Sequence, residues 1–160
     1  MNVMATTPRP ILCCTDFSDG AGAAVEHAIR LGRALRAPVV IAHAMDTGAD
    51  ADAATPPEIA EAERVLRARV GERVEDARTA LGSLAAEAGA GVTSTILNGR
   101  PADAIVAYAA AIDADWVVVG AHGASSKHAM RDAALGWLLG STAERVVRNA
   151  GRPVIVVPPR

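Results

Sequence analysis

The chain has only two cysteines, and their placement excludes the sites that depend on paired thiols. Cys13 and Cys14 are adjacent in a chain of 160 residues, so neither a C-x-x-C spacing nor the second cysteine pair of a structural zinc site is present. Adjacent side chains on a strand point to opposite faces. We therefore expect both cysteines to be small buried hydrophobic residues.

A strong charge of one sign and long apolar runs are missing as well. The formal net charge is -2 and the pI is near 6.1, which gives no electrostatic reason to expect nucleic acid or a membrane surface as a partner. No apolar stretch approaches the length of a membrane span, and no basic start precedes an apolar run. Because 51% of the residues are hydrophobic, we expect a single cytoplasmic domain over residues 1–160 with an adequate core.

Two nucleotide-binding motifs are absent. No glycine-lysine pair occurs anywhere in the chain, although a P-loop needs one. The first apolar strand leads into T-D-F-S-D-G-A-G, whereas a dinucleotide-binding fold places G-x-G-x-x-G there. The sequence therefore excludes a P-loop phosphotransferase and a dinucleotide oxidoreductase.

Apolar strands alternate with helical patterns along the chain. Hydrophobic periodicity and turn residues predict strands at residues 11–15, 39–45, 92–97, 116–119 and 154–157. They predict helices near residues 25–35, 58–89, 102–112 and 141–149. We expect residues 1–9 to be a mobile tail and residues 46–57 a flexible loop. The alternation predicts an α/β fold with a doubly wound, mostly parallel sheet.

The longest helical pattern carries one apolar stripe despite two glycines, Gly71 and Gly82. Its members step by three or four residues or their sums: Ile59, Leu66, Val70, Val74, Ala77, Leu81, Leu84 and Ala88. This spacing predicts one long amphipathic helix.

Small and polar residues gather where strands end and where the last helix begins. In doubly wound sheets, ligands bind beyond the carboxyl ends of the strands where the strand order reverses. Glycine amides at a positive helix end suit a phosphate group, because no Cβ obstructs the approach. The sequence predicts one crevice formed by Thr15, Asp16, Gly120, Gly123, Gly140 and Ser141.

The same residues also fit a purely structural interpretation. Ser141 and Glu144 have the S-x-x-E spacing of a capping box, in which Ser141 caps the helix and Glu144 reaches back to the N–H of Ser141. Gly120 and Gly123 are then turn glycines at a strand end. Both interpretations stay open at this point.

Four segments together resemble the universal stress protein family. They are C-T-D-F-S, the pair His43-Ala44, the block D-A-D-W-V-V-V-G-A-H-G, and the ending G-S-T-A-E-R-V-V-R-N-A-G-R-P-V-I-V-V. The resemblance covers nearly the whole chain, and its carboxyl-terminal half is specific. It implies a five-stranded parallel sheet of order 3-2-1-4-5 with helices on both faces. It also implies ATP as the ligand in one branch of the family, usually in a homodimer.

The ATP-binding branch has the motif glycine, two residues, glycine, nine residues, glycine, then serine or threonine. The residue types of Gly120, Gly123, Gly140 and Ser141 match it. The resemblance further implies Thr15, Asp16 and Ala44 around adenine and ribose, Thr142 as another amide at the phosphates, and Mg²⁺ with the ATP. The spacer at 124–139 departs from the family, because it has sixteen residues instead of nine.

These features lead us to expect an ATP-binding stress protein that acts through ligand-dependent conformation or partner choice, with little or no hydrolysis. One alternative is an interaction module of the same fold, without nucleotide, in which the spacer closes the crevice. Another is a hydrolase that uses Asp16. We expect His43 and His122 to orient neighbours through hydrogen bonds rather than to catalyse.

The spacer contains Lys127, His128 and Arg131, which would share one face of a helix. That face would either clamp phosphates or be a solvated basic surface.

The last strand, Val154, Ile155, Val156 and Val157, lies at a sheet edge in the implied strand order. A bare edge exposes unpaired backbone groups. Two copies related by a two-fold axis can pair these edges antiparallel, so we expect a homodimer through this strand.

Overall fold

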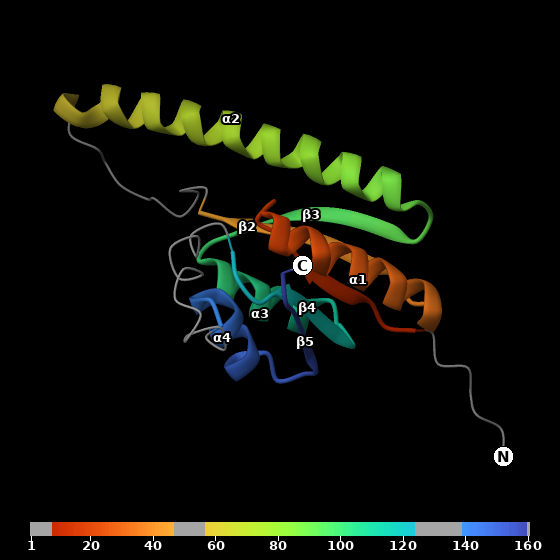
Figure 1. Cartoon of the computed structure of the whole chain (residues 1–160). Helices are drawn as coiled ribbons and strands as arrows, with labels where there is room; N and C mark the ends of the chain where they lie inside the picture. The colour runs from red at the N-terminus through yellow and green to blue at the C-terminus, as the bar shows by residue number, and fades with distance from the viewer. Residues whose placement is uncertain (1–7, 47–56, 124–138, 160) are drawn as a thin grey trace, which may run out of the picture.

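The computed structural model describes residues 8–46, 57–123 and 139–159, and the side chains of residues 57–62 are outside the description. The elements are β1 (Ile11–Cys14), α1 (Asp19–Leu35), β2 (Val39–Met45), α2 (Pro57–Ala88), β3 (Val92–Asn98), α3 (Pro101–Ala111), β4 (Trp116–Gly120), α4 (Ser141–Asn149) and β5 (Val154–Val157) (Figure 1). Nearly all of the expected tail, the expected loop at 46–57 and the spacer lies outside the described residues.

The strands form one parallel sheet in the order β3-β2-β1-β4-β5. This is the predicted α/β fold and the predicted strand order. Because β1 lies in the middle, the chain leaves it through α1 toward β2 and returns through α3 to β4 on its other side. The strand order therefore reverses between β1 and β4, where the sequence places the crevice.

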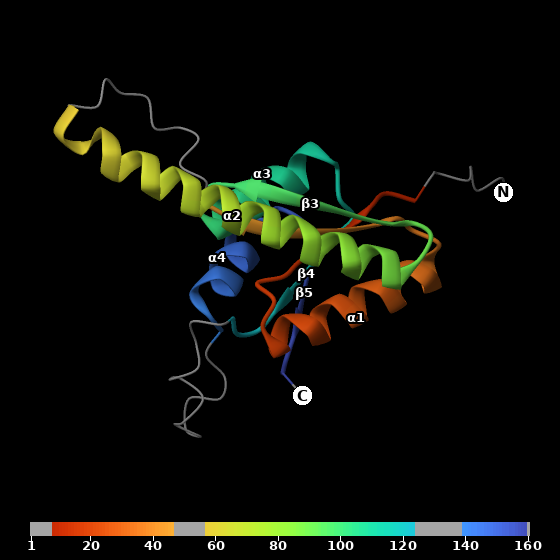
Figure 2. The same cartoon turned by 90° about the horizontal axis from the view of Figure 1, so that it is seen from above.

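Helices cover both faces of the sheet: α1 and α2 lie on one face, and α3 and α4 lie on the other (Figures 1 and 2). Alternate residues of β1 pack against the helices on opposite faces of the sheet. Cys13 packs with the α1 and α2 layer and is fully buried, whereas Cys14 packs with the other layer and is partly exposed. The cysteines thus point to opposite faces, as predicted, but only Cys13 is fully buried.

Helix α1 begins directly after the turn that follows β1. Ser18 is its N-cap, and its Oγ accepts a hydrogen bond from the N–H of Ala21 at 3.3 Å. The helix ends at Arg36, which has a left-handed φ of 54°. Gly32 lies against β2 so closely that a Cβ there would be 2.3 Å from a methyl group of Val39. This contact sets how near the helix lies to the sheet.

Helix α2 is longer than the sheet that it covers. Its 32 residues span about 48 Å, whereas the seven residues of β3 span about 23 Å. Ala77 and Leu81 are buried, but Val65 is 45% exposed and Leu66 is 62% exposed. The predicted long helix is confirmed. Among its described side chains the apolar stripe is buried only in the second half, because the first half extends beyond the sheet (Figure 2). None of the described helices combines the length and hydropathy needed to cross a bilayer.

Candidate functional site

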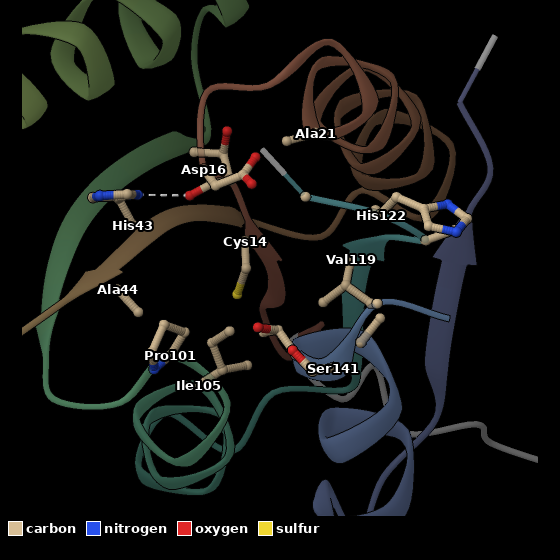
Figure 3. A pocket seen from close by; sticks show the side chains of 17 residues that line it. Cys14, Asp16, Ala21, His43, Ala44, Pro101, Ile105, Val119, His122 and Ser141 are labelled. Atoms are coloured by element: carbon tan, nitrogen blue, oxygen red, sulfur yellow. Dashed lines mark hydrogen bonds between the residues drawn. The ribbon is translucent and has the colours of Figure 1, made fainter. Parts of the chain in front are cut away.

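A cavity of about 190 Å³ lies at the carboxyl ends of β1, β2 and β4, beside the first turns of α3 and α4 (Figure 3). Its lining includes every residue that the sequence assigned to the crevice: Thr15, Asp16, Ala44, Gly120, Gly123, Gly140, Ser141 and Thr142. The topology brings them together, because parallel strands end at the same edge and the order reverses there.

The residues that flank the spacer meet at this cavity. The N–H of Gly140 donates a hydrogen bond to the carbonyl of Ala121 at 2.8 Å, and the N–H of Ala121 donates to the carbonyl of Val157 at 2.8 Å. The chain that leaves β4 therefore returns to the end of β4 before α4 begins. The seven residues by which the spacer exceeds the family's nine do not move Gly140 away from Gly120.

The start of α4 is uncapped by any side chain in the described part of the chain. Gly140 is the N-cap residue, with φ -60° and ψ 151°, and Ser141 is the first residue of the helix. Glu144 pairs with Arg148 at 2.7 Å. Of the two open interpretations, the capping box is therefore wrong, because Ser141 lies one position inside the helix, where its side chain does not cap. The amides of the first turn remain at the cavity with the positive end of the helix dipole.

Asp16 is held in the turn between β1 and α1. Its Oδ1 accepts hydrogen bonds from the N–H of Ser18 at 3.1 Å and from the Oγ of Ser18 at 2.5 Å. The Oγ1 of Thr15 accepts from the N–H of Phe17 at 3.0 Å. These bonds hold Phe17 at a φ of 62°, an uncommon value for a residue other than glycine. The turn is therefore preorganised beside the cavity.

Gly120 and Gly123 lie close to this turn. A Cβ on Gly123 would be 2.5 Å from the Oδ2 of Asp16, and a Cβ on Gly120 would be 3.2 Å from the carbonyl oxygen of Gly20. Contact at 2.5 Å is shorter than real Cβ atoms make, so any larger residue at Gly123 requires either Asp16 or the chain at Gly123 to move. Both glycines let the end of β4 approach the start of α1.

The two histidines at the site differ. The Nδ1 of His43 lies 2.8 Å from the carbonyl oxygen of Thr15, and since a carbonyl only accepts, Nδ1 carries the proton. The ring of His43 also packs against Phe17, with centroids 4.8 Å apart. The orienting role predicted for His43 is confirmed. His122 turns its ring away from the cavity toward β5 (Figure 3), and within the described residues its buried Nδ1 has no hydrogen-bond partner.

One wall of the cavity is apolar and was missed by the sequence analysis. It includes Cys14, Pro101, Ile105 and Val119. Figure 3 shows the sulfur of Cys14 directed into the cavity, and burial raises the pKa of its thiol well above the usual value. Helical spacing identified Ile105 as an inward residue, but spacing does not distinguish a core contact from a cavity wall.

The cavity has little fixed charge. Asp16 is the only carboxylate, and no lysine or arginine occurs, among its described lining residues. In the same part of the chain, no three His, Cys, Asp or Glu side chains are close enough to hold a metal ion. The candidate phosphate clamp of Lys127, His128 and Arg131 lies outside the described residues. Positive potential at the described cavity comes from backbone amides at the start of α4.

Comparison with known proteins finds relatives over nearly the full chain. The sequence model of the universal stress protein family matches residues 7–158. A universal stress protein of Methanocaldococcus jannaschii is 30% identical over 153 residues, which cover 93% of this chain and 81% of that protein.

Solved structures have the same fold. The universal stress protein UspA of Lactobacillus plantarum has a TM-score of 0.69 and 27% identity, over 95% of this chain and 99% of that one. A universal stress protein of Archaeoglobus fulgidus, solved in complex with dAMP, has a TM-score of 0.64 and 23% identity, over 95% of this chain and 99% of that one.

Proposed function

Because the chain belongs to the universal stress protein family, we propose that it binds ATP in the cavity between β1, β4 and α4. The observation that carries this proposal is the hydrogen bond from Gly140 to Ala121 at 2.8 Å, which keeps the uncapped start of α4 beside the end of β4. Related support comes from the Archaeoglobus fulgidus protein of the same fold, which was solved with dAMP.

The phosphates lie at the start of α4 in this proposal. The backbone amides of Ser141 and Thr142 face them, since the N–H of Gly140 already donates to Ala121, and the hydroxyl groups of Ser141 and Thr142 are available as further donors. Gly120 and Gly123 keep side chains out of the approach. Since no lysine or arginine is among the described lining residues, the phosphate contacts are made largely by backbone dipoles.

The adenosine part lies toward β1 and β2. Thr15, Asp16 and Ala44 surround the adenine and ribose, and the Asp16 carboxylate is oriented as a hydrogen-bond acceptor by Ser18. The apolar wall formed by Cys14, Ile105 and Val119 suits the flat face of a base. Mg²⁺ accompanies the phosphates and is bound mainly through their oxygens, since Mg²⁺ usually combines substrate phosphates, waters and few carboxylates.

The protein acts as a nucleotide-dependent switch with little hydrolysis. His43 uses its Nδ1 proton to hold the carbonyl of Thr15, His122 faces away from the cavity, and Asp16 is engaged by Ser18. In this proposal neither histidine activates water, and the Asp16 carboxylate is taken up by the ribose. We expect turnover far below the enzyme median of about 10 per second. Robust phosphate release that Asp16→Asn abolishes while ATP still binds would instead favour a hydrolase.

Calorimetry and thermal unfolding test the binding. ATP with Mg²⁺ should bind at micromolar strength and raise the melting temperature, because a ligand specific for the folded state stabilises it. Gly140→Val should abolish both signals by placing a branched side chain at the phosphates. Gly82→Val is the matched control, since a Cβ there meets nothing within 4 Å. No heat and no melting shift at millimolar ATP would favour the interaction module without nucleotide.

We also propose a homodimer through β5. Within the described sheet β5 pairs only with β4, and all four of its residues are partly exposed. Antiparallel pairing of two β5 edges satisfies their backbone groups. Val157→Lys should convert the dimer to a monomer in sedimentation, whereas Val147→Lys, on the exposed face of α4, should not. A wild-type protein that sediments as a monomer at high micromolar concentration would contradict this dimer.

A further inference from the structure

A second, larger cavity forms a groove on the face of the sheet opposite α3 and α4. It measures about 730 Å³ and lies between α1 and α2. Its apolar lining comes from Val25 and Ile29 on α1 and from Ala80 and Leu84 on α2. We call this cavity the α1/α2 groove. An apolar groove between two helices is the shape that receives the apolar face of a third helix.

The same chain carries exposed apolar residues on a helix. Residues 63–76 of α2, here called the α2 arm, precede Ala77, the first buried residue of the helix among those whose side chains are described. Val65 and Leu66 on this arm are 45% and 62% exposed. Leu66 belongs to the stripe that continues into Ala77 and Leu81 on the sheet. The arm therefore extends an apolar face past the part of the protein that buries it (Figure 2).

We propose that the α2 arm of one copy docks in the α1/α2 groove of a second copy, and that the contact is reciprocal. A two-fold axis that crosses α2 near Val74 lays the two helices antiparallel. This register brings Leu66 of each copy to the level of Ala80 to Leu84 in the other, which is the α2 wall of the groove. One symmetric contact then covers both arms and fills both grooves.

The order of charges along the groove agrees with this direction. Glu26, Arg30 and Arg33 follow one another on the α1 wall. Helix α1 runs parallel to the second half of α2, since Arg33 donates to the carbonyl of Ala88 at 3.0 Å and Gly22 and Ala80 line the same groove. An antiparallel arm consequently brings Arg67 to the level of Glu26 and Glu63 to the level of Arg30 and Arg33.

The charges of Glu63 and Arg67 on the arm are exposed to solvent. Glu63 and Arg67 form an ion pair at 3.6 Å within the helix, with side chains that are 41% and 68% exposed. Such exposed pairs contribute little to stability. A parallel arm would place Glu63 by Glu26 and Arg67 by Arg30, so the charges of the α1 wall favour the antiparallel direction.

This association uses no residue of β5 and shares only Thr15 with the lining of the cavity that we propose for ATP, and sedimentation equilibrium without nucleotide separates it from the β5 contact. Leu66→Arg should raise the dissociation constant of the α2 association by at least about tenfold, the loss typical of a central apolar contact. The matched control is Leu35→Arg, because Leu35 is 47% exposed on α1 and lies outside the groove. Val157→Lys should remove only the β5 association.

The groove side has its own pair of variants. A Cβ on Gly22 or on Gly82 meets nothing within 4 Å, but only Gly22 lines the groove. Gly22→Leu should weaken the association as Leu66→Arg does, and Gly82→Leu should leave it unchanged. Both leucines favour the helix, so the folded state is retained.

Mixing the two defective chains tests the pairing directly. Leu66→Arg retains an intact groove and Gly22→Leu retains an intact arm, so the mixture should regain one of the two contacts and associate more strongly than either chain alone. A wild-type protein without this association, or one in which Leu66→Arg and Gly22→Leu sediment as the wild type does, would overturn the proposal. Loss of association in the Val157→Lys variant alone would likewise assign assembly to β5 only.

Discussion

Gly123→Ala should damage the site through Asp16. The Cβ of an alanine at this position would lie 2.5 Å from the Oδ2 of Asp16, about 1 Å inside an ordinary contact. The carboxylate does not move freely, because its Oδ1 accepts two hydrogen bonds from Ser18. Either these bonds break or the chain at Gly123 shifts away from the β1–α1 turn.

The magnitude follows from these two routes. Forcing a methyl group into a filled space costs about 1–3 kcal/mol, and loss of a hydrogen bond to a charged group costs about 1.5–3 kcal/mol. We therefore expect Gly123→Ala to lower the free energy of unfolding by about 2 kcal/mol. In a chain of this length, that lowers the melting temperature by about 4–8 °C. By contrast, Gly82→Ala should gain up to about 1 kcal/mol, because it only improves helix propensity.

A double-mutant cycle with Asp16→Ala measures the contact itself. Denaturant unfolding of the wild type, both single variants and the double variant gives the coupling energy. If Asp16 is what an alanine at Gly123 meets, the double variant should lose at least about 1 kcal/mol less than the two single losses combined. Losses that add within about 0.5 kcal/mol would refute the steric argument.

Three further predictions concern other parts of the molecule. At pH 8, Cys14 should react slowly with a thiol reagent and more slowly still with ATP present, and Cys13, whose pKa burial raises to about 12, should react only on unfolding. Equal reaction of both thiols at the rate of free cysteine would contradict this. Hydrogen bonding to Arg9 lowers the pKa of the Asp113 carboxyl below its ordinary 3.8. The ionised Asp113 therefore stabilises the folded state above that value, and this contribution is lost as the pH falls through the lowered pKa. The stability difference between wild type and Asp113→Asn should accordingly shrink in acid; a difference constant from pH 6 to pH 2 would disprove the link. Gly32→Ala should destabilise by about 1–3 kcal/mol or more, because its Cβ would clash with β2, and an unchanged melting temperature would rule out that close packing.

The sequence alone determined the fold. Strand and helix periodicities are local properties, and the observed bounds of β2 and β5 agree with the prediction, while β1, β3 and β4 differ from it by one residue. The start of α1 was less predictable, because the helix begins at Asp19, before its apolar stripe. There the hydrogen bond from Ala21 to Ser18, rather than hydrophobic spacing, sets the boundary.

The sequence also indicated which residues form the site, because the glycines, Asp16 and Ser141 lie at predicted strand ends and at a predicted helix start. Their roles depended on tertiary structure. The S-x-x-E pattern is consistent with Ser141 as the N-cap residue of α4. In the structure Gly140, held by its hydrogen bond to Ala121, is the N-cap residue, and Ser141 is already the first residue of the helix. A short sequence pattern cannot predict such a contact, because the two partners are distant in sequence.

Tertiary structure decided which apolar residues are buried and which remain exposed. Leu66 and Leu81 belong to one stripe in the sequence, yet Leu66 is 62% exposed and Leu81 is 2% exposed. Ile105 and Cys14 are similarly apolar in pattern and turn out to line a cavity. Periodicity reports the direction in which a side chain points. Whether something lies there depends on the length of the sheet and the placement of its neighbours, which only the folded chain specifies.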